Sequence, residues 1–188
     1  MNIPDFFFNN KNIFNLSDEA IYQLKTIFHP IDIKKGETFL NEGEPNYNIY
    51  IMHKGIVKTW FWRNDRERIL NFIFENEPLI LPTTKYNRLK VSATTVEDSI
   101  LYVTNKSELK DLMKKSQELS YWGFQLIDKF ITLLAEDTLD YYWMPKQDIY
   151  KLLLEKHPDV LQRIPLKDIA AYLNITPSSL SRIRANIK

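Results

Sequence analysis

Between residues 31 and 104, apolar and polar positions alternate in short runs that turn signals separate. Six runs have the length of strands: Thr38–Leu40, Asn48–His53, Ile56–Trp62, Arg68–Phe74, Lys90–Val96 and Ser99–Val103. The reversals between them coincide with residues that tolerate positive φ, namely Gly36, Gly43, Gly55 and the pair Asn64-Asp65. Strands this short and this regularly spaced predict an antiparallel roll, barrel or sandwich.

Short helices are predicted on both sides of the strand region. Ser17 is suited to cap the first of them, whose apolar residues share one face: Ile21, Leu24, Ile27 and Phe28. Asn105 and Glu108 have the spacing of a capping box and open a second helix, which runs through Met113. Pro145 precedes a third helix, residues 146–156, and is either a helix stop or a hinge between domains.

The segment from Leu119 to Leu139 predicts a longer helix with two apolar faces. One face carries Leu119, Trp122, Leu126, Phe130 and Leu133, and the other carries Ile127, Ile131 and Leu134. Burial of both faces inside one subunit is one explanation. In the alternative, one face packs on the β domain and the other meets a second copy of the chain, and this parallel two-helix seam makes a homodimer.

Residues 164–184 meet the steric requirements of a helix-turn-helix. Ala170 is the small residue needed where two helices cross, and apolar positions fill the shared core: Ile169, Leu173, Ile175, Leu180 and Ile183. Asn174 tolerates the left-handed geometry of the turn. Thr176 and Pro177 are suited to the N-cap and the first position of the second helix. A generic helical hairpin with polar residues outside is the alternative.

The second helix of this segment has a polar outer face when Leu180, Ile183 and Ile187 point inward. Ser178, Ser181 and Arg182 lie on that outer face. Arg182 can pair with a guanine edge through two hydrogen bonds, and the serines can contact either base edges or phosphates. The candidate phosphate contacts are Thr176, Ser179, Arg184 and Lys188. The face therefore predicts DNA binding.

The composition of the 188-residue chain narrows the function further. The absence of cysteine excludes disulfides, thiolate metal sites and iron–sulfur clusters. No run of eighteen apolar residues and no signal-peptide pattern occurs, so we expect a cytoplasmic protein without a membrane partner. The net charge of +1 indicates no partner by itself, but no acidic residue follows Asp168, whereas Arg182, Arg184 and Lys188 do.

Enzymatic chemistry is not expected. A cupin-type metal site needs clustered histidines, and the strand region contains only His53; with His29 and His157 it is expected at the surface or in a turn. No Gly-x-Ser-x-Gly elbow occurs either. The sequence thus predicts no catalytic residue, no metal and no cofactor. The competing function is a small-molecule-binding β-barrel protein whose helical tail mediates protein interaction.

Together these segments resemble the Crp/Fnr family of bacterial transcription regulators over nearly the whole chain. Residues 33–45 and 49–57 are similar to the opening of a cyclic-nucleotide-binding domain, and residues 157–184 are similar to Bacteroidetes members. The resemblance implies an α+β fold: an antiparallel β-roll or jelly-roll sensor domain over residues 1–118, a dimerisation helix and hinge over 119–144, and an all-α helix-turn-helix DNA-binding domain over 145–188.

The same resemblance implies a homodimer that binds a two-fold-symmetric DNA operator, with half-sites about 34 Å apart. It leaves open a contact with RNA polymerase, an unidentified small-molecule effector, and the choice between activation and repression.

The phosphate-binding segment departs from the family. Members that bind cyclic AMP hold its phosphate and ribose with a Gly-Glu pair and with an arginine that precedes a small hydroxyl residue. Residues 77–93 contain no glycine, and Val91 stands in the arginine's place before Ser92. Lys85 and Arg88, with Ser92, remain as candidate ligand contacts. We therefore expect no cyclic AMP binding in the usual mode. The roll either responds to another small molecule or serves only as a scaffold for dimerisation.

Overall fold

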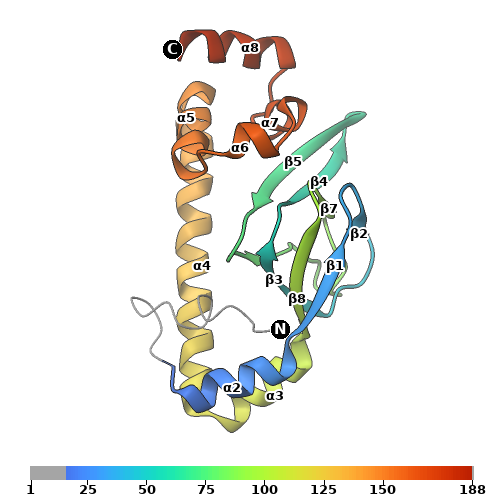
Figure 1. Ribbon diagram of the computed structural model, residues 1–188, viewed down its shortest axis with the longest axis vertical. Helices are drawn as coiled ribbons and strands as arrows, with labels where there is room; N and C mark the ends of the chain where they lie inside the picture. Colours follow the sequence, from blue (N-terminus) through green and yellow to red (C-terminus); the bar gives the residue numbers. More distant parts are fainter. Residues whose placement is uncertain (1–15, 188) are drawn as a thin grey trace.

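The structure, a computed structural model, describes residues 16–187, apart from the side chains at positions 129, 130, 133, 137 and 140. A long helix, α4, runs beside a β-roll, with helices at both of its ends (Figure 1). In chain order the described elements are α2 (Asp18–Ile27), β1 (His29–Ile33), β2 (Thr38–Leu40), β3 (Asn48–Lys54), β4 (Val57–Arg63), β5 (Arg66–Ile73), β6 (Pro78–Leu79), β7 (Ser92–Thr95), β8 (Ser99–Asn105), α3 (Lys106–Lys115), α4 (Gln117–Trp143), α5 (Lys146–Lys156), α6 (Val160–Arg163), α7 (Leu166–Tyr172) and α8 (Pro177–Asn186).

The roll consists of two antiparallel sheets with the strand orders β1-β8-β3-β6 and β2-β7-β4-β5. Both sheets contribute side chains to one core: Ile33, Leu40, Tyr50, Met52, Val57, Ile73, Leu79, Leu89, Ala93 and Leu101. This arrangement confirms the expected α+β fold with a jelly-roll core. The sequence did not predict β1 and β6, because each contains a proline and neither shows a clean alternation of buried and exposed positions.

The turn between β4 and β5 follows the sequence prediction. Asn64 and Asp65 have φ values of 52° and 55°, the left-handed geometry that joins two twisted strands through a two-residue loop. Gly55, which precedes β4, has a φ of 98°, and a Cβ there would come within 2.3 Å of the Ser99 Oγ atom. Glycine is therefore required at position 55 for both conformation and space.

The helices at one end of the long helix pack on it and on the roll. In α2, the Ser17 side chain accepts a hydrogen bond from the Ala20 N–H at 3.2 Å, which confirms the N-cap. In α3, Asn105 and Glu108 form the predicted capping box. The core between α2, α3, α4 and the roll contains Ala20, Ile21, Leu24, Phe28, Ile51, Tyr102, Leu109, Leu119 and Trp122.

The long helix α4 is longer than its sequence pattern indicated, and its two apolar faces differ. On the first face, Leu119 and Trp122 are buried and Leu126 packs beside them, while Phe130 and Leu133 lie outside the described side chains. On the second face, Ile127, Ile131 and Leu134 are 59%, 63% and 68% exposed. Burial of both faces within one subunit is therefore wrong for this chain.

The four C-terminal helices α5 to α8 gather at the other end of α4, with α7 beside β5 (Figure 1). Helix α5 has the predicted bounds, and Ile149 and Leu153 are buried while Leu152 is partly exposed. These helices share one core with the roll: Ile56, Ile69, Phe72, Phe74, Val96, Ile149, Tyr150, Leu153, Val160, Ile164, Ile169, Ala170, Leu173 and Leu180. The short helix α6 and this shared core were not predicted from the sequence.

Candidate nucleic-acid interface

Helices α7 and α8 are joined by a tight turn at Asn174. Its φ is 55°, the left-handed conformation expected for this position. The turn is closed by a 3.0 Å hydrogen bond from the Ile175 N–H to the Ala170 carbonyl. Ala170 is almost fully buried, so a larger side chain there would push the two helices apart.

The start of α8 is defined by its cap. Thr176 has extended backbone geometry, and its Oγ1 accepts a hydrogen bond from the Ser179 N–H at 3.2 Å. Pro177 occupies the first turn, where its missing N–H leaves no backbone acceptor unpaired. Both predictions made from the sequence are confirmed. The hydroxyls of Ser178 and Ser179 also lie 2.9 Å from Thr176 Oγ1, so the three side chains form one hydroxyl cluster.

Helix α8 has an apolar inner face and a polar outer one. Leu180 is buried, and Ile183 and Ile187 are partly buried against the shared core. The exposed residues of the segment are Thr176, Pro177, Ser178, Ser181, Arg182, Arg184, Ala185 and Asn186. In the described part of the chain neither Arg182 nor Arg184 forms an ion pair, so both guanidinium groups are open to an anion. Ser179 is only partly exposed, and Lys188 lies outside the described residues.

Helix α7 is held on the outer surface of the roll by polar and aromatic contacts. Lys58 of β4 forms ion pairs with Asp168 of α7, at 3.2 Å, and with Glu67, at 2.6 Å. The ring of Phe72 on β5 lies 5.5 Å from that of Tyr172. Lys58 is shared by Asp168 and Glu67, so its single positive charge offsets only part of the negative charge of the two carboxylates.

Arg163, the last residue of α6, joins the helices to two loops of the roll. Its Nη1 donates to Oε2 of Glu75 at 3.2 Å, and its Nε donates to Oε1 of Glu97 at 3.2 Å. A third bond, at 3.1 Å, reaches Asp159. Hydrogen bonds to Glu97 and Glu75 raise the pKa of Arg163. Burial acts to raise the pKa of Glu75, but the bonds from Arg163 and the Gly55 N–H outweigh it and leave that pKa lowered.

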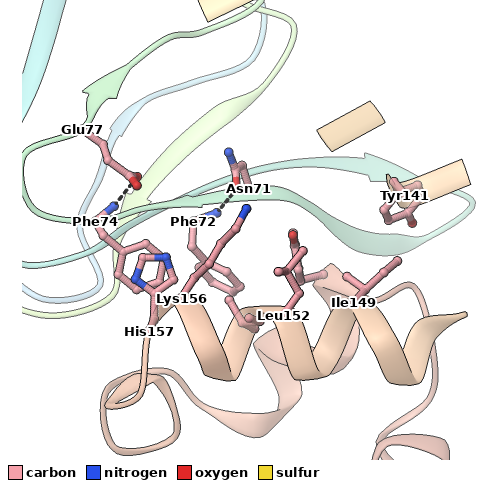
Figure 2. A pocket seen from close by; sticks show the side chains of 11 residues that line it. Asn71, Phe72, Phe74, Glu77, Tyr141, Ile149, Leu152, Lys156 and His157 are labelled. Atoms are coloured by element: carbon pink, nitrogen blue, oxygen red, sulfur yellow. Dashed lines mark hydrogen bonds between the residues drawn. The ribbon is translucent and has the colours of Figure 1, made fainter. Parts of the chain in front are cut away.

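A small cavity of about 140 Å³ lies between β5, α5 and the end of α4 (Figure 2). Its lining consists of Asn71, Phe72, Phe74, Glu77, Tyr141, Ile149, Leu152, Leu153, Lys156, His157 and Tyr172. The imidazole of His157 stacks on the ring of Phe74, with centroids 3.4 Å apart. Burial lowers the pKa of His157 and so favours the neutral form of the stacked ring.

Of the histidine predictions, the one for His53 needs correction. His157 follows α5 in a turn, as expected, but it packs against the roll and is only partly exposed. His53 lies within β3, not in a turn, and its Nδ1 atom is buried. The described side chains include no group of three His, Asp or Glu that could hold a metal ion.

The three candidate ligand contacts of the roll have separate partners. Ser92 is buried, and its Oγ accepts a hydrogen bond from the Glu42 N–H at 3.0 Å. Arg88 donates to the Gly43 carbonyl at 2.9 Å. Lys85 places its ammonium group 5.0 Å from the ring of Tyr86. The buried hydroxyl is thus part of the roll's own structure, and the two cations are on its surface.

Residues 30–116, which include the roll from β2 to β8 and helix α3, match the family model of the cyclic nucleotide-binding domain. No curated protein matches the chain in sequence. The described helices include none that is long and apolar enough to cross a membrane.

Solved structures similar to this chain include regulators of the Crp/Fnr type. FixK2 from Bradyrhizobium japonicum is 18% identical, with a TM-score of 0.71, over 86% of this chain and 84% of its own. The c-di-GMP-responsive regulator CLP of Xanthomonas campestris is 15% identical, with a TM-score of 0.69, over 91% of each chain. A Crp/Fnr-family protein from Eubacterium rectale is 16% identical, with a TM-score of 0.68, over 96% of this chain and 87% of its own. At these identities the likeness shows a shared fold.

Proposed function

We propose that this protein is a sequence-specific DNA-binding transcription regulator of the Crp/Fnr type. The observation that carries the proposal is the α7–α8 unit, in which a tight turn holds α8 with its polar face exposed. The arginines on that face form no ion pair among the described residues, and no acidic residue follows Asp168 in the sequence. An exposed helix of this kind fits the major groove of DNA.

In this function the residues of α8 divide into two groups. Arg182 reads a base edge, and Ser178 and Ser181 lie on the same face to contact bases or phosphates. Thr176, Ser179, Arg184 and Lys188 hold the phosphate backbone. Residues 1–118 then form the sensor domain, 119–144 the dimerisation helix and hinge, and 145–188 the DNA-binding domain. The protein acts in the cytoplasm, and it is not an enzyme.

The regulator acts as a homodimer that binds a two-fold-symmetric operator. Support comes from the exposed apolar row on α4, in which Phe124, Ile127, Ile131 and Leu134 recur at intervals of three and four residues. This is the spacing of a two-helix seam. A monomer would leave the whole row in water, whereas a second copy of α4 covers it.

Replacement of Arg182 by alanine is expected to relax base preference. Loss of one bidentate contact to a guanine costs about 1–3 kcal/mol of discrimination, or roughly a 5- to 150-fold loss on the specific site. Affinity for random DNA should change far less. Operator fragments selected from genomic DNA, followed by titration of specific and random duplexes, measure both effects.

The matched control is Arg184→Ala, which removes an arginine from the same helix. This variant should weaken binding on specific and random DNA alike and reduce the salt dependence by about one phosphate contact. Equal losses from Arg182→Ala on both kinds of DNA would remove Arg182 as a base reader. If binding by the unaltered protein does not weaken with rising salt, the helical unit binds a protein instead of DNA.

Cyclic AMP is not the effector in the usual mode. The Ser92 hydroxyl is already hydrogen-bonded to the Glu42 N–H, and the apolar side chain of Val91 is buried beside it. Calorimetry of the purified protein with cyclic AMP is therefore expected to show no saturable heat at micromolar concentration. The control is DNA binding by the same sample, which shows that the protein is active. A saturable micromolar isotherm would contradict this expectation.

A further inference from the structure

The attachment of the C-terminal helices to the roll is more specific than an apolar contact requires. Arg163 makes hydrogen bonds to Glu75, which follows β5, and to Glu97, which precedes β8. Its side chain is only 20% exposed, and those of the two glutamates are 31% and 29% exposed. A planar guanidinium that pairs with two carboxylates at once permits only one orientation.

Arg163 is also close in the chain to the helices that carry the DNA-binding face. Ile164 and Pro165 alone separate it from α7, and the Ile164 side chain is buried in the shared core. A shift of Arg163 therefore moves the beginning of α7. Through the tight turn at Asn174 the same shift moves α8, because α7 and α8 pack on each other as one unit.

A second ion pair, between Lys58 and Asp168, also attaches the unit formed by α7 and α8 to the roll. Lys58 and Asp168 are 13% and 11% exposed, and their 3.2 Å contact lies in the first turn of α7. Two separated anchors, at Arg163 and at Lys58, determine both the position and the rotation of a rigid unit on the roll. Apolar packing alone would tolerate sliding more easily, since it is not directional.

We infer that Arg163 is a positioning residue for DNA reading: it holds α8 at one place relative to the roll of its own protomer. In a dimer, the two rolls and the two α4 helices then determine how far apart the two α8 helices lie. The contacts of Arg163 with Glu75 and Glu97 thereby determine the half-site spacing that the regulator accepts. This inference rests on the proposed function.

The test measures binding to operators whose half-sites are separated by the natural distance, or by one or two base pairs more or less. Each added base pair shifts a half-site by about 3.4 Å and rotates it by about 34°. The unaltered protein should lose at least about tenfold in affinity for each step. For Arg163→Met, which keeps the length of the side chain without its charge, the loss should be less than about threefold. Affinity for a single half-site should stay unchanged.

The matched control is Arg66→Met, which replaces an exposed arginine at the tip of the β4–β5 hairpin that forms no ion pair with any described side chain. It should keep the steep dependence on spacing. Glu97→Gln retains a hydrogen-bond acceptor but removes one charge, and it should give an intermediate dependence if Arg163→Met does not fold. A merely structural role for Arg163 would lower the unfolding temperature without changing the spacing dependence.

The outcomes separate the inference from the function on which it rests. Steep spacing dependence in both Arg163→Met and Glu97→Gln overturns the positioning role, while specific binding by the unaltered protein leaves the proposed function intact. If the unaltered protein binds no DNA fragment, the proposed function fails and the inference with it.

Discussion

Replacement of Ile131 by glutamate is expected to convert the proposed dimer into monomers and to lower affinity for the proposed DNA operator at least about 100-fold. Ile131 is 63% exposed, in the middle of the apolar row on α4. In a two-helix seam its side chain meets the same residue of the other copy, so the substitution places two like charges in an apolar contact. Loss of the second reading helix then removes the gain from bivalent binding, which commonly reaches 10²–10⁴.

Light scattering after size exclusion measures the mass, and titration of a two-half-site duplex measures the affinity. The control is Ile80→Glu, which introduces the same charge at an isoleucine of nearly equal exposure, 56%, just after β6. That variant should remain dimeric and bind normally. A dimeric Ile131→Glu protein would show that α4 does not form the seam, and a monomeric Ile80→Glu protein would place the interface on the roll.

Replacement of Leu173 by alanine is expected to lower the free energy of unfolding by about 2–5 kcal/mol. Leu173 is fully buried at the end of α7, in the core that the helical unit shares with the roll. Removal of its side chain leaves a cavity among Ile169, Leu180 and their neighbours, and the rigid turn at Asn174 limits how far these can collapse. Urea unfolding followed by fluorescence and circular dichroism measures the change.

Leu166→Ala is the matched control, because it makes the same substitution at the first residue of α7, where the side chain is 40% exposed. Its effect should be below about 1 kcal/mol. Since Leu173 lies in a core that joins both parts of the chain, its loss should shift unfolding of the roll and of the helices together. A shift confined to the helices would mean that the two parts unfold independently.

The local features of the chain could be read from neighbouring residues. The caps at Ser17, Asn105 and Thr176, and the left-handed turn at Asn174, depend on contacts within three or four positions. The alternation of apolar residues likewise predicted six of the strands, because a strand with one buried face shows it directly in sequence. Two strands were missed: β1 is short and has a proline at its second residue, and β6 has only two residues.

The candidate DNA-reading face was predicted almost entirely from sequence, since capping and helical periodicity determine which side chains point outward. Ser178, Ser181, Arg182 and Arg184 are exposed as expected, while Ser179 is partly covered beside Thr176. The sequence could not indicate how α7 and α8 are attached to the roll. No periodicity relates Arg163 to Glu75 and Glu97, or Lys58 to Asp168.

By itself, therefore, the sequence determined the elements, their caps and the polarity of α8, because these depend on interactions between residues close in the chain. Only the tertiary structure decided that the α7–α8 unit is attached to the roll by the ion pairs of Arg163 and Lys58. In the sequence, Arg163 lies 66 positions from Glu97 and 88 from Glu75, and Lys58 lies 110 positions from Asp168. Side chains so distant in sequence come into contact only when the sheets and α4 have folded. The sequence around an acidic or basic residue does not indicate which distant residue it will pair with.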